Sequence, residues 1–90
     1  MKDIMEEYQN YLRGKYRKRN TIYGYYEYAK LFLNYVDKDI DEINKDDLKK
    51  WHIYITDRYE VNGNIKRIQA VNDFFRWLGK DDLTLPISRQ

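Results

Sequence analysis

Apolar side chains recur every three or four residues along most of the 90-residue chain, and this spacing constrains the fold more than any other feature. It is clearest after residue 21, where Ile22, Tyr25, Ala29 and Phe32 fall on one face of a helix of about 16 residues. No segment shows the strict alternation of apolar and polar side chains that is typical of a half-buried strand. The sequence therefore predicts an all-α protein.

Helix-stop and N-cap residues predict the ends of the first two helices. The first covers residues 4–12, and Gly14 offers a natural stop. A basic loop over residues 15–19 follows, and Asn20 or Thr21 is a suitable N-cap for the second helix, because their side chains can accept a hydrogen bond from a first-turn N–H group. The second helix is expected to end near Val36, and a charged connection follows.

The third and fourth helices have stronger boundary signals. Asn44 and Asp47 have the spacing of a capping box, with Asp in the place of the usual Glu. The run Asn62-Gly63-Asn64 predicts a turn, followed by a helix from Ile65 to Leu78 that Gly79 would terminate. The segments together predict one compact four-helix domain over residues 1–80, with residues 81–90 as a tail or linker.

Composition excludes several classes of chemistry. The chain has no cysteine and one histidine, His52, so neither a thiolate zinc site nor a disulfide framework is expected. Its one serine, Ser88, is among the last three residues, far from His52 in sequence, so a Ser-His-Asp triad is not expected. No apolar run is long enough for a membrane span, and no signal peptide is evident. We expect a cytoplasmic, non-enzymatic domain that needs no cofactor or metal and has no membrane partner.

The net charge of +2 conceals two concentrations of positive charge. Residues 13–19 contain five basic side chains and no acidic one, and residues 65–80 contain four basic side chains and one acidic one. Each run lies beside a predicted helix N-terminus, where free N–H groups and the helix dipole also favour an anion. Such surfaces suit DNA phosphates, although a charged loop that simply keeps a small domain in solution is the plainer interpretation of either run alone.

Three motifs in the same order resemble a known family. Residues 21–32 carry Thr-Ile-x-x-Tyr followed by Ala and Phe, residues 40–48 carry Ile-x-x-Ile-x-x-x-Asp-Leu, and residues 64–78 carry a basic pair, an Ala and Phe-Phe-x-Trp-Leu. The set is similar to the N-terminal core-binding domain of the tyrosine recombinase, or phage integrase, family. The resemblance covers residues 4–86.

The resemblance implies a SAM-like four-helix fold that forms the non-catalytic half of a clamp around double-stranded DNA. It also implies two partners, the DNA and the catalytic domain of a parent recombinase, with residues 81–90 beginning the linker between the domains. Ninety residues have no room for the family's catalytic domain, so no tyrosine here is assigned a catalytic role. The isolated domain is expected to be a monomer.

The candidate DNA-binding residues come from the two basic runs and the helices beside them. The loop side chains are expected to lie against phosphates, and the residues of the fourth helix nearer to base edges. The full set is Lys15, Arg17, Lys18, Arg19, Asn20, Thr21, Tyr28, Asn64, Lys66, Arg67, Gln69 and Arg76.

Two other functions stay open on this evidence. One is a small helical protein–protein interaction domain, which would need no salt-sensitive surface. The other is a transcriptional regulator that uses the third and fourth helices as a helix-turn-helix.

Overall fold

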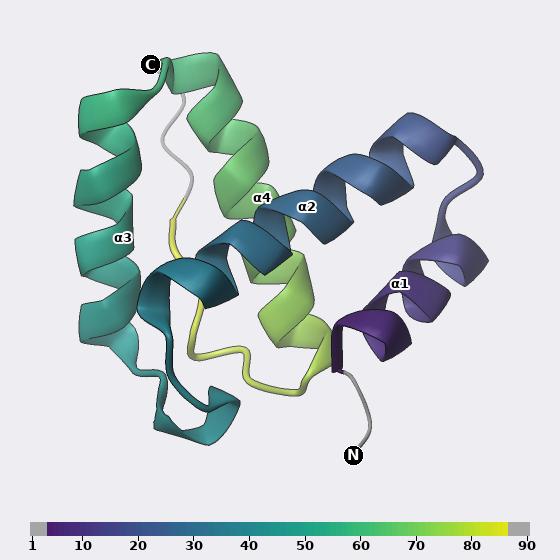
Figure 1. Cartoon of the computed structure of the whole chain (residues 1–90), viewed down its shortest axis with the longest axis horizontal. Coiled ribbons are helices and arrows are strands. Elements are labelled where there is room, and N and C mark those ends of the chain that lie inside the picture. The colour runs from purple at the N-terminus through teal and green to yellow at the C-terminus, as the bar shows by residue number, and fades with distance from the viewer. Residues whose placement is uncertain (1–3, 87–90) are drawn as a thin grey trace.

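A computed structural model describes residues 4–86 and contains four α-helices and one short 3₁₀-helix (Figure 1). The elements are α1 (Ile4–Lys15), α2 (Arg19–Val36), η1 (Ile40–Glu42), α3 (Lys45–Arg58) and α4 (Val61–Trp77). The described part of the chain has no strand, and none of its helices is both long and apolar enough to cross a bilayer. The predicted all-α, four-helix architecture is confirmed.

Helix α2 is the central element. It crosses α4 and packs along α1, while α3 lies on the far side of α4 from α1 (Figure 1). All four helices contribute side chains to one core, whose fully buried members include Tyr8, Leu12, Phe32, Leu48, Ile55, Val71, Phe74 and Phe75.

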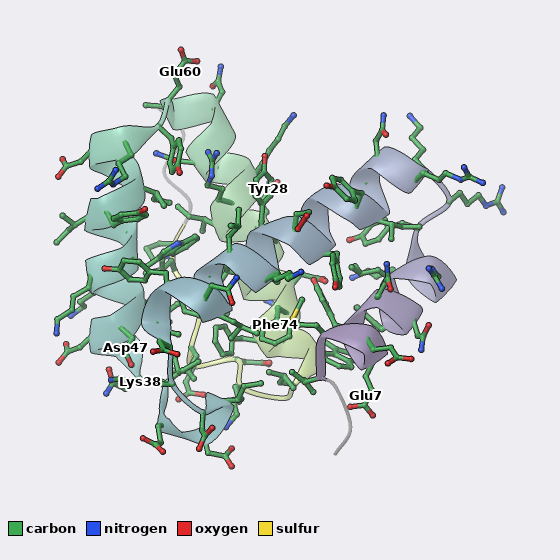
Figure 2. All side chains as sticks on the ribbon, viewed as in Figure 1. Glu7, Tyr28, Lys38, Asp47, Glu60 and Phe74 are labelled. Atoms are coloured by element: carbon green, nitrogen blue, oxygen red, sulfur yellow. The ribbon has the colours of Figure 1, made fainter. Side chains whose placement is uncertain are left out.

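Aromatic rings hold the centre of this core together. The ring of Phe32, on α2, meets Trp51 of α3 and Phe75 of α4 edge-on, with centroids 5.1 and 5.7 Å apart. Phe74, labelled in Figure 2, meets Tyr8 of α1 in the same way at 5.0 Å. Edge-to-face pairs contribute beyond the area they bury, so these rings also fix how the helices cross.

A polar network ties α1 to α4 beside the core. The buried Tyr8 hydroxyl donates to Asp73 Oδ2 at 2.8 Å, and Lys15 Nζ donates to Asp73 Oδ1 at 3.0 Å. Burial raises the pKa of Tyr8 far above its ordinary value, and the bond to Asp73 acts in the same direction. The Tyr8 hydroxyl therefore stays a donor, and Asp73 accepts from both partners.

The start of α3 has the predicted capping box. The Asp47 N–H donates to Asn44 Oδ1, and the Asn44 N–H donates to Asp47 Oδ2, both at 3.1 Å. Lys38 Nζ lies 3.0 Å from Asp47 Oδ1 (Figure 2). The Asn44 bond lowers the pKa of Asp47, Lys38 adds to this effect, and burial opposes it.

The predicted turn at Asn62-Gly63-Asn64 is wrong, because these residues form the first turn of α4. The chain reverses earlier, at Tyr59 and Glu60. The Asn64 side chain is buried and donates to the carbonyl oxygens of Ile55, at 2.9 Å, and Tyr59, at 3.3 Å. The asparagine thus satisfies carbonyls at the end of α3 from inside the next helix, a role that local turn propensity does not predict.

The predicted ends of the other helices are partly right. Gly14 does not stop α1, which continues to Lys15. Helix α2 begins at Arg19, so neither Asn20 nor Thr21 is its N-cap; Lys18 holds that position without a side-chain bond. Gly79 does end α4, with a left-handed φ of 79° that glycine adopts without strain.

The segment after α4 packs back onto the domain. Leu83 is buried, and the Asn72 side chain makes two hydrogen bonds of 2.8 Å with the backbone of Leu85, one to its N–H and one to its carbonyl oxygen. The first half of the predicted tail therefore belongs to the packed unit. Residues 87–90, Ser88 among them, lie outside the described part of the chain.

Candidate nucleic-acid interface

A groove runs between the N-terminal half of α2 and the middle of α4. We call it the α2–α4 groove; its volume is about 350 Å³, and it is lined by Asn20, Thr21, Gly24, Tyr25, Tyr28, Lys66 and Gln69. Five of these seven residues, all except Gly24 and Tyr25, are among the DNA-binding candidates chosen from the sequence. The structure thus brings residues of α2 together with residues of α4 that lie 38 to 49 positions further along the chain.

Helical spacing explains why these side chains share one surface. Residues 20, 21, 24, 25 and 28 of α2 are three or four positions apart and lie on one face, as do Lys66 and Gln69 of α4. Because α2 crosses α4, the two faces meet in the groove. The groove presents amide, hydroxyl and ammonium groups, which can all bond to phosphate or base edges.

Gly24 opens one wall of the groove. A methyl group placed on its Cα would meet nothing within 4 Å beyond the two neighbouring residues and the local backbone of α2. Packing inside the domain therefore does not require glycine here, although glycine in a helix costs about 1 kcal/mol relative to alanine. The sequence predicts only that Gly24 lowers the stability of its helix. The structure adds that Gly24 lines the groove.

Tyr25 serves mainly as packing beneath the groove, as its helical spacing predicts. Its ring lies against Tyr16, with centroids 5.2 Å apart, and against the core. Burial and a hydrogen bond with Tyr16 raise the pKa of Tyr25 to about 12. Its hydroxyl is therefore protonated at neutral pH.

The exposed basic residues Arg17, Lys18 and Arg19 lie at one end of the groove, where the chain enters α2. In the described part of the chain, none of the three has an acidic partner. Because Lys18 provides no side-chain cap, the first-turn N–H groups of α2 add to the positive potential there.

Lys15 differs from its basic neighbours. Its ammonium group pairs with Asp73 and donates to the Tyr11 hydroxyl at 3.1 Å, although the side chain is 44% exposed. The hydrogen bonds to Tyr11 and then to Asp73 raise the pKa of Lys15 above its ordinary value. Lys15 is thus engaged in holding α1 against α4.

The other candidates on α4 do not line the groove. The Asn64 amide donates its hydrogen bonds to carbonyl oxygens at the end of α3. Arg76 is exposed on the last turn of α4. Arg67 stacks on Tyr59, with Cζ 3.9 Å from the ring centroid. Because α4 begins at Val61, Lys66 and Arg67 lie in its second turn and not at its N-terminus.

Charge is polarised along α2. Arg17 and Lys18 precede α2 and Arg19 is its first residue, while the connection after its last turn contains the acidic residues 37, 39, 41 and 42. The 18-residue helix separates these ends by about 27 Å. A polyanion would therefore be attracted to the N-terminal end of α2 and repelled from the other end.

Comparison of the chain with protein-family models, with curated proteins and with solved structures gave no match in any of the three. Within residues 4–86, no group of three or more His, Cys, Asp or Glu side chains is placed to hold a metal ion.

Proposed function

We propose that this chain is a double-stranded-DNA-binding module, the SAM-like core-binding domain of a tyrosine recombinase, which forms the non-catalytic half of a clamp around its site. The observation that carries the proposal is the α2–α4 groove, which is lined by five of the DNA-binding candidates predicted from the sequence. The groove adjoins the basic segment of residues 17–19, whose side chains form no ion pair within residues 4–86. The three sequence motifs that resemble the family fall on α2, on η1 with the start of α3, and on α4.

The two parts of this surface would have different tasks. Arg17, Lys18 and Arg19 would neutralise phosphates whatever the sequence, helped by the free N–H groups of α2. Lys66 and Gln69 project from α4 into the groove and are the candidates for contact with base edges. Gly24 would let the DNA backbone approach α2 closely, since it presents no side chain there.

The test is the salt dependence of duplex binding. Replacing Arg17, Lys18 and Arg19 by Ala should weaken binding to all duplexes alike and lower the slope of log K against log salt concentration by up to about 3. The matched control replaces Lys45, Lys49 and Lys50, three exposed lysines on α3 that do not line the groove. This control removes the same charge and should leave the slope nearly unchanged.

Fluorescence anisotropy at low salt with a long duplex gives the measurement, because half a clamp binds weakly. Equal affinities of the wild type and the triple variant, with helicity intact by circular dichroism, would remove the basic segment from the interface. Gln69→Ala should instead reduce the preference for a cognate sequence, by about 1–3 kcal/mol if a bidentate base contact is lost. Binding of a protein partner that is insensitive to salt would favour the interaction-domain alternative.

A further inference from the structure

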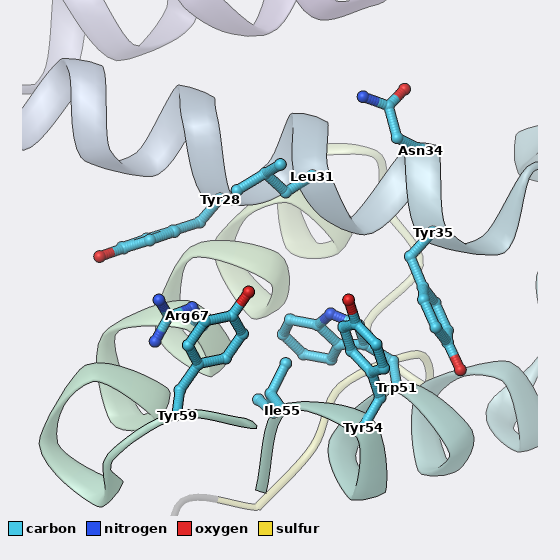
Figure 3. Close-up of a pocket in the computed structure, with 9 residues that line it drawn as sticks. All are labelled: Tyr28, Leu31, Asn34, Tyr35, Trp51, Tyr54, Ile55, Tyr59 and Arg67. Carbon is cyan, nitrogen blue, oxygen red and sulfur yellow. The ribbon is translucent and has the colours of Figure 1, made fainter. Parts of the chain in front are cut away.

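A second cavity, of about 290 Å³, lies between α2, α3 and the start of α4. Its walls are mainly aromatic, and we call it the aromatic pocket, defined by Tyr28, Tyr35, Trp51, Tyr54, Tyr59 and Arg67. Figure 3 shows Tyr28 reaching over it from α2, with Tyr59, Trp51 and Tyr54 on the opposite side and Arg67 below Tyr28. Tyr35 and Tyr59 are 40% and 45% exposed, so the pocket opens to solvent.

Arg67 presents free donors to this pocket. Its guanidinium lies on the ring of Tyr59 and 5.1 Å from the centroid of Tyr28, and one nitrogen donates to Asn64 Oδ1 at 3.3 Å. No acidic side chain in residues 4–86 forms an ion pair with it. Gly63 makes room for this arrangement, because a Cβ there would lie 2.8 Å from Arg67 Nη1.

The charge around the pocket favours an anionic occupant. No acidic side chain lines the pocket, and a second guanidinium, that of Arg58, lies 4.6 Å from the centroid of Tyr54. Tyr54 in turn packs against Tyr35, with centroids 4.7 Å apart. Flat rings with guanidinium groups beside them are the components by which proteins bind unpaired bases and their phosphates.

The aromatic pocket also adjoins the α2–α4 groove, because Tyr28 lines both. A strand that follows the groove can therefore reach the pocket within a short distance. The pocket's volume of about 290 Å³ lies just below the usual range for ligand sites, about 300–1,000 Å³. This size suits a single planar group better than a run of peptide side chains.

We propose that the aromatic pocket binds one unpaired nucleobase of a DNA strand held in the adjoining groove, the base stacking on the tyrosines and its phosphate bonding to Arg67. The inference rests on the proposed function, since the groove must first hold DNA. It adds a preference for duplexes that carry an unpaired base, which groove binding alone does not require.

The test compares a blunt duplex with the same duplex carrying one bulged thymidine, both labelled with fluorescein and titrated by anisotropy. The wild type should bind the bulged duplex roughly 5-fold more tightly or better, the lower limit for stacking one base. Tyr59→Ala should abolish this preference, and so should Arg67→Lys, which keeps the charge but loses the planar guanidinium. Tyr23→Ala is the matched control, since Tyr23 is 66% exposed on α2 and lines neither cavity.

The outcomes separate this inference from the proposed function. Equal binding of both duplexes by the wild type, or a preference that survives Tyr59→Ala, overturns the pocket's role and leaves duplex binding standing. Binding of neither DNA overturns both. Binding of a Glu- and Phe-containing peptide that Tyr59→Ala abolishes assigns the pocket to a protein partner and also overturns the inference. Tyr35→Ala replaces Tyr59→Ala if circular dichroism shows that the latter does not fold.

Discussion

Replacing Gly24 by Ala separates the stability of the fold from the function of the groove. Beyond its neighbouring residues and the local backbone of α2, the added methyl group would meet nothing within 4 Å, and the φ of Gly24 is not in the left-handed region. The full difference in helix propensity, about 1 kcal/mol, should therefore appear as a gain in the free energy of unfolding. For a domain of this size, that gain raises the midpoint of thermal unfolding by roughly 4–8 °C.

The same methyl group would project into the α2–α4 groove. If a DNA backbone packs against Gly24, an added methyl costs about 1–3 kcal/mol, the usual range for overfilling a close contact. Duplex affinity should then fall by roughly 5-fold or more while stability rises. Circular dichroism melts and anisotropy titrations at one salt concentration give the two quantities.

Gly14→Ala is the matched control for this experiment. It makes the same chemical change in α1, where the new methyl would also meet nothing within 4 Å, but Gly14 does not line the groove. It should stabilise the domain by a smaller amount, since it lies in the last turn, and leave duplex affinity unchanged. A Gly24→Ala variant that is less stable than the wild type would contradict the conclusion that there is room for a methyl group at Gly24. Unchanged duplex affinity would contradict the close approach of DNA to Gly24.

Three further predictions concern the fold. Tyr8→Phe removes the bond to Asp73 and should lower the free energy of unfolding in urea by about 1.5–3 kcal/mol, the range for a hydrogen bond to a charged group; a loss below 0.5 kcal/mol would contradict the network. Because the pKa of Asp47 is lowered in the folded state, its contribution to stability is complete above the ordinary carboxyl pKa of about 3.9 and is lost as the pH falls through the folded value. Asp47→Asn should therefore flatten the stability profile below about pH 4, and an unchanged profile would rule out this role. Asn72→Ala removes two bonds to Leu85 and should cost about 2 kcal/mol, with faster amide exchange at Leu85; exchange at the wild-type rate would show that other contacts hold the segment.

Local signals predicted much of the helical framework. The stripe of α2 from Ile22 to Phe32, the capping box at Asn44 and the termination by Gly79 each depend on residues within a few positions of one another. The physics is short-ranged, so the sequence contains it directly. The same locality explains the errors at Asn64 and at the start of α2, where a partner from another element or the path of the chain outweighs local preference.

The candidate site divides in the same way. Sequence alone determined which side chains could attract DNA, because basic charge and helical spacing are visible along the chain. The crossing of α2 over α4 decided which of them share a groove: it joined Asn20 and Thr21 to Lys66 and Gln69, while the contact with Asp73 engaged Lys15. Likewise, Arg67 turned toward Tyr59 and helped to form the aromatic pocket. These outcomes depend on contacts between residues up to 58 positions apart, which only the packing of the whole core brings within reach.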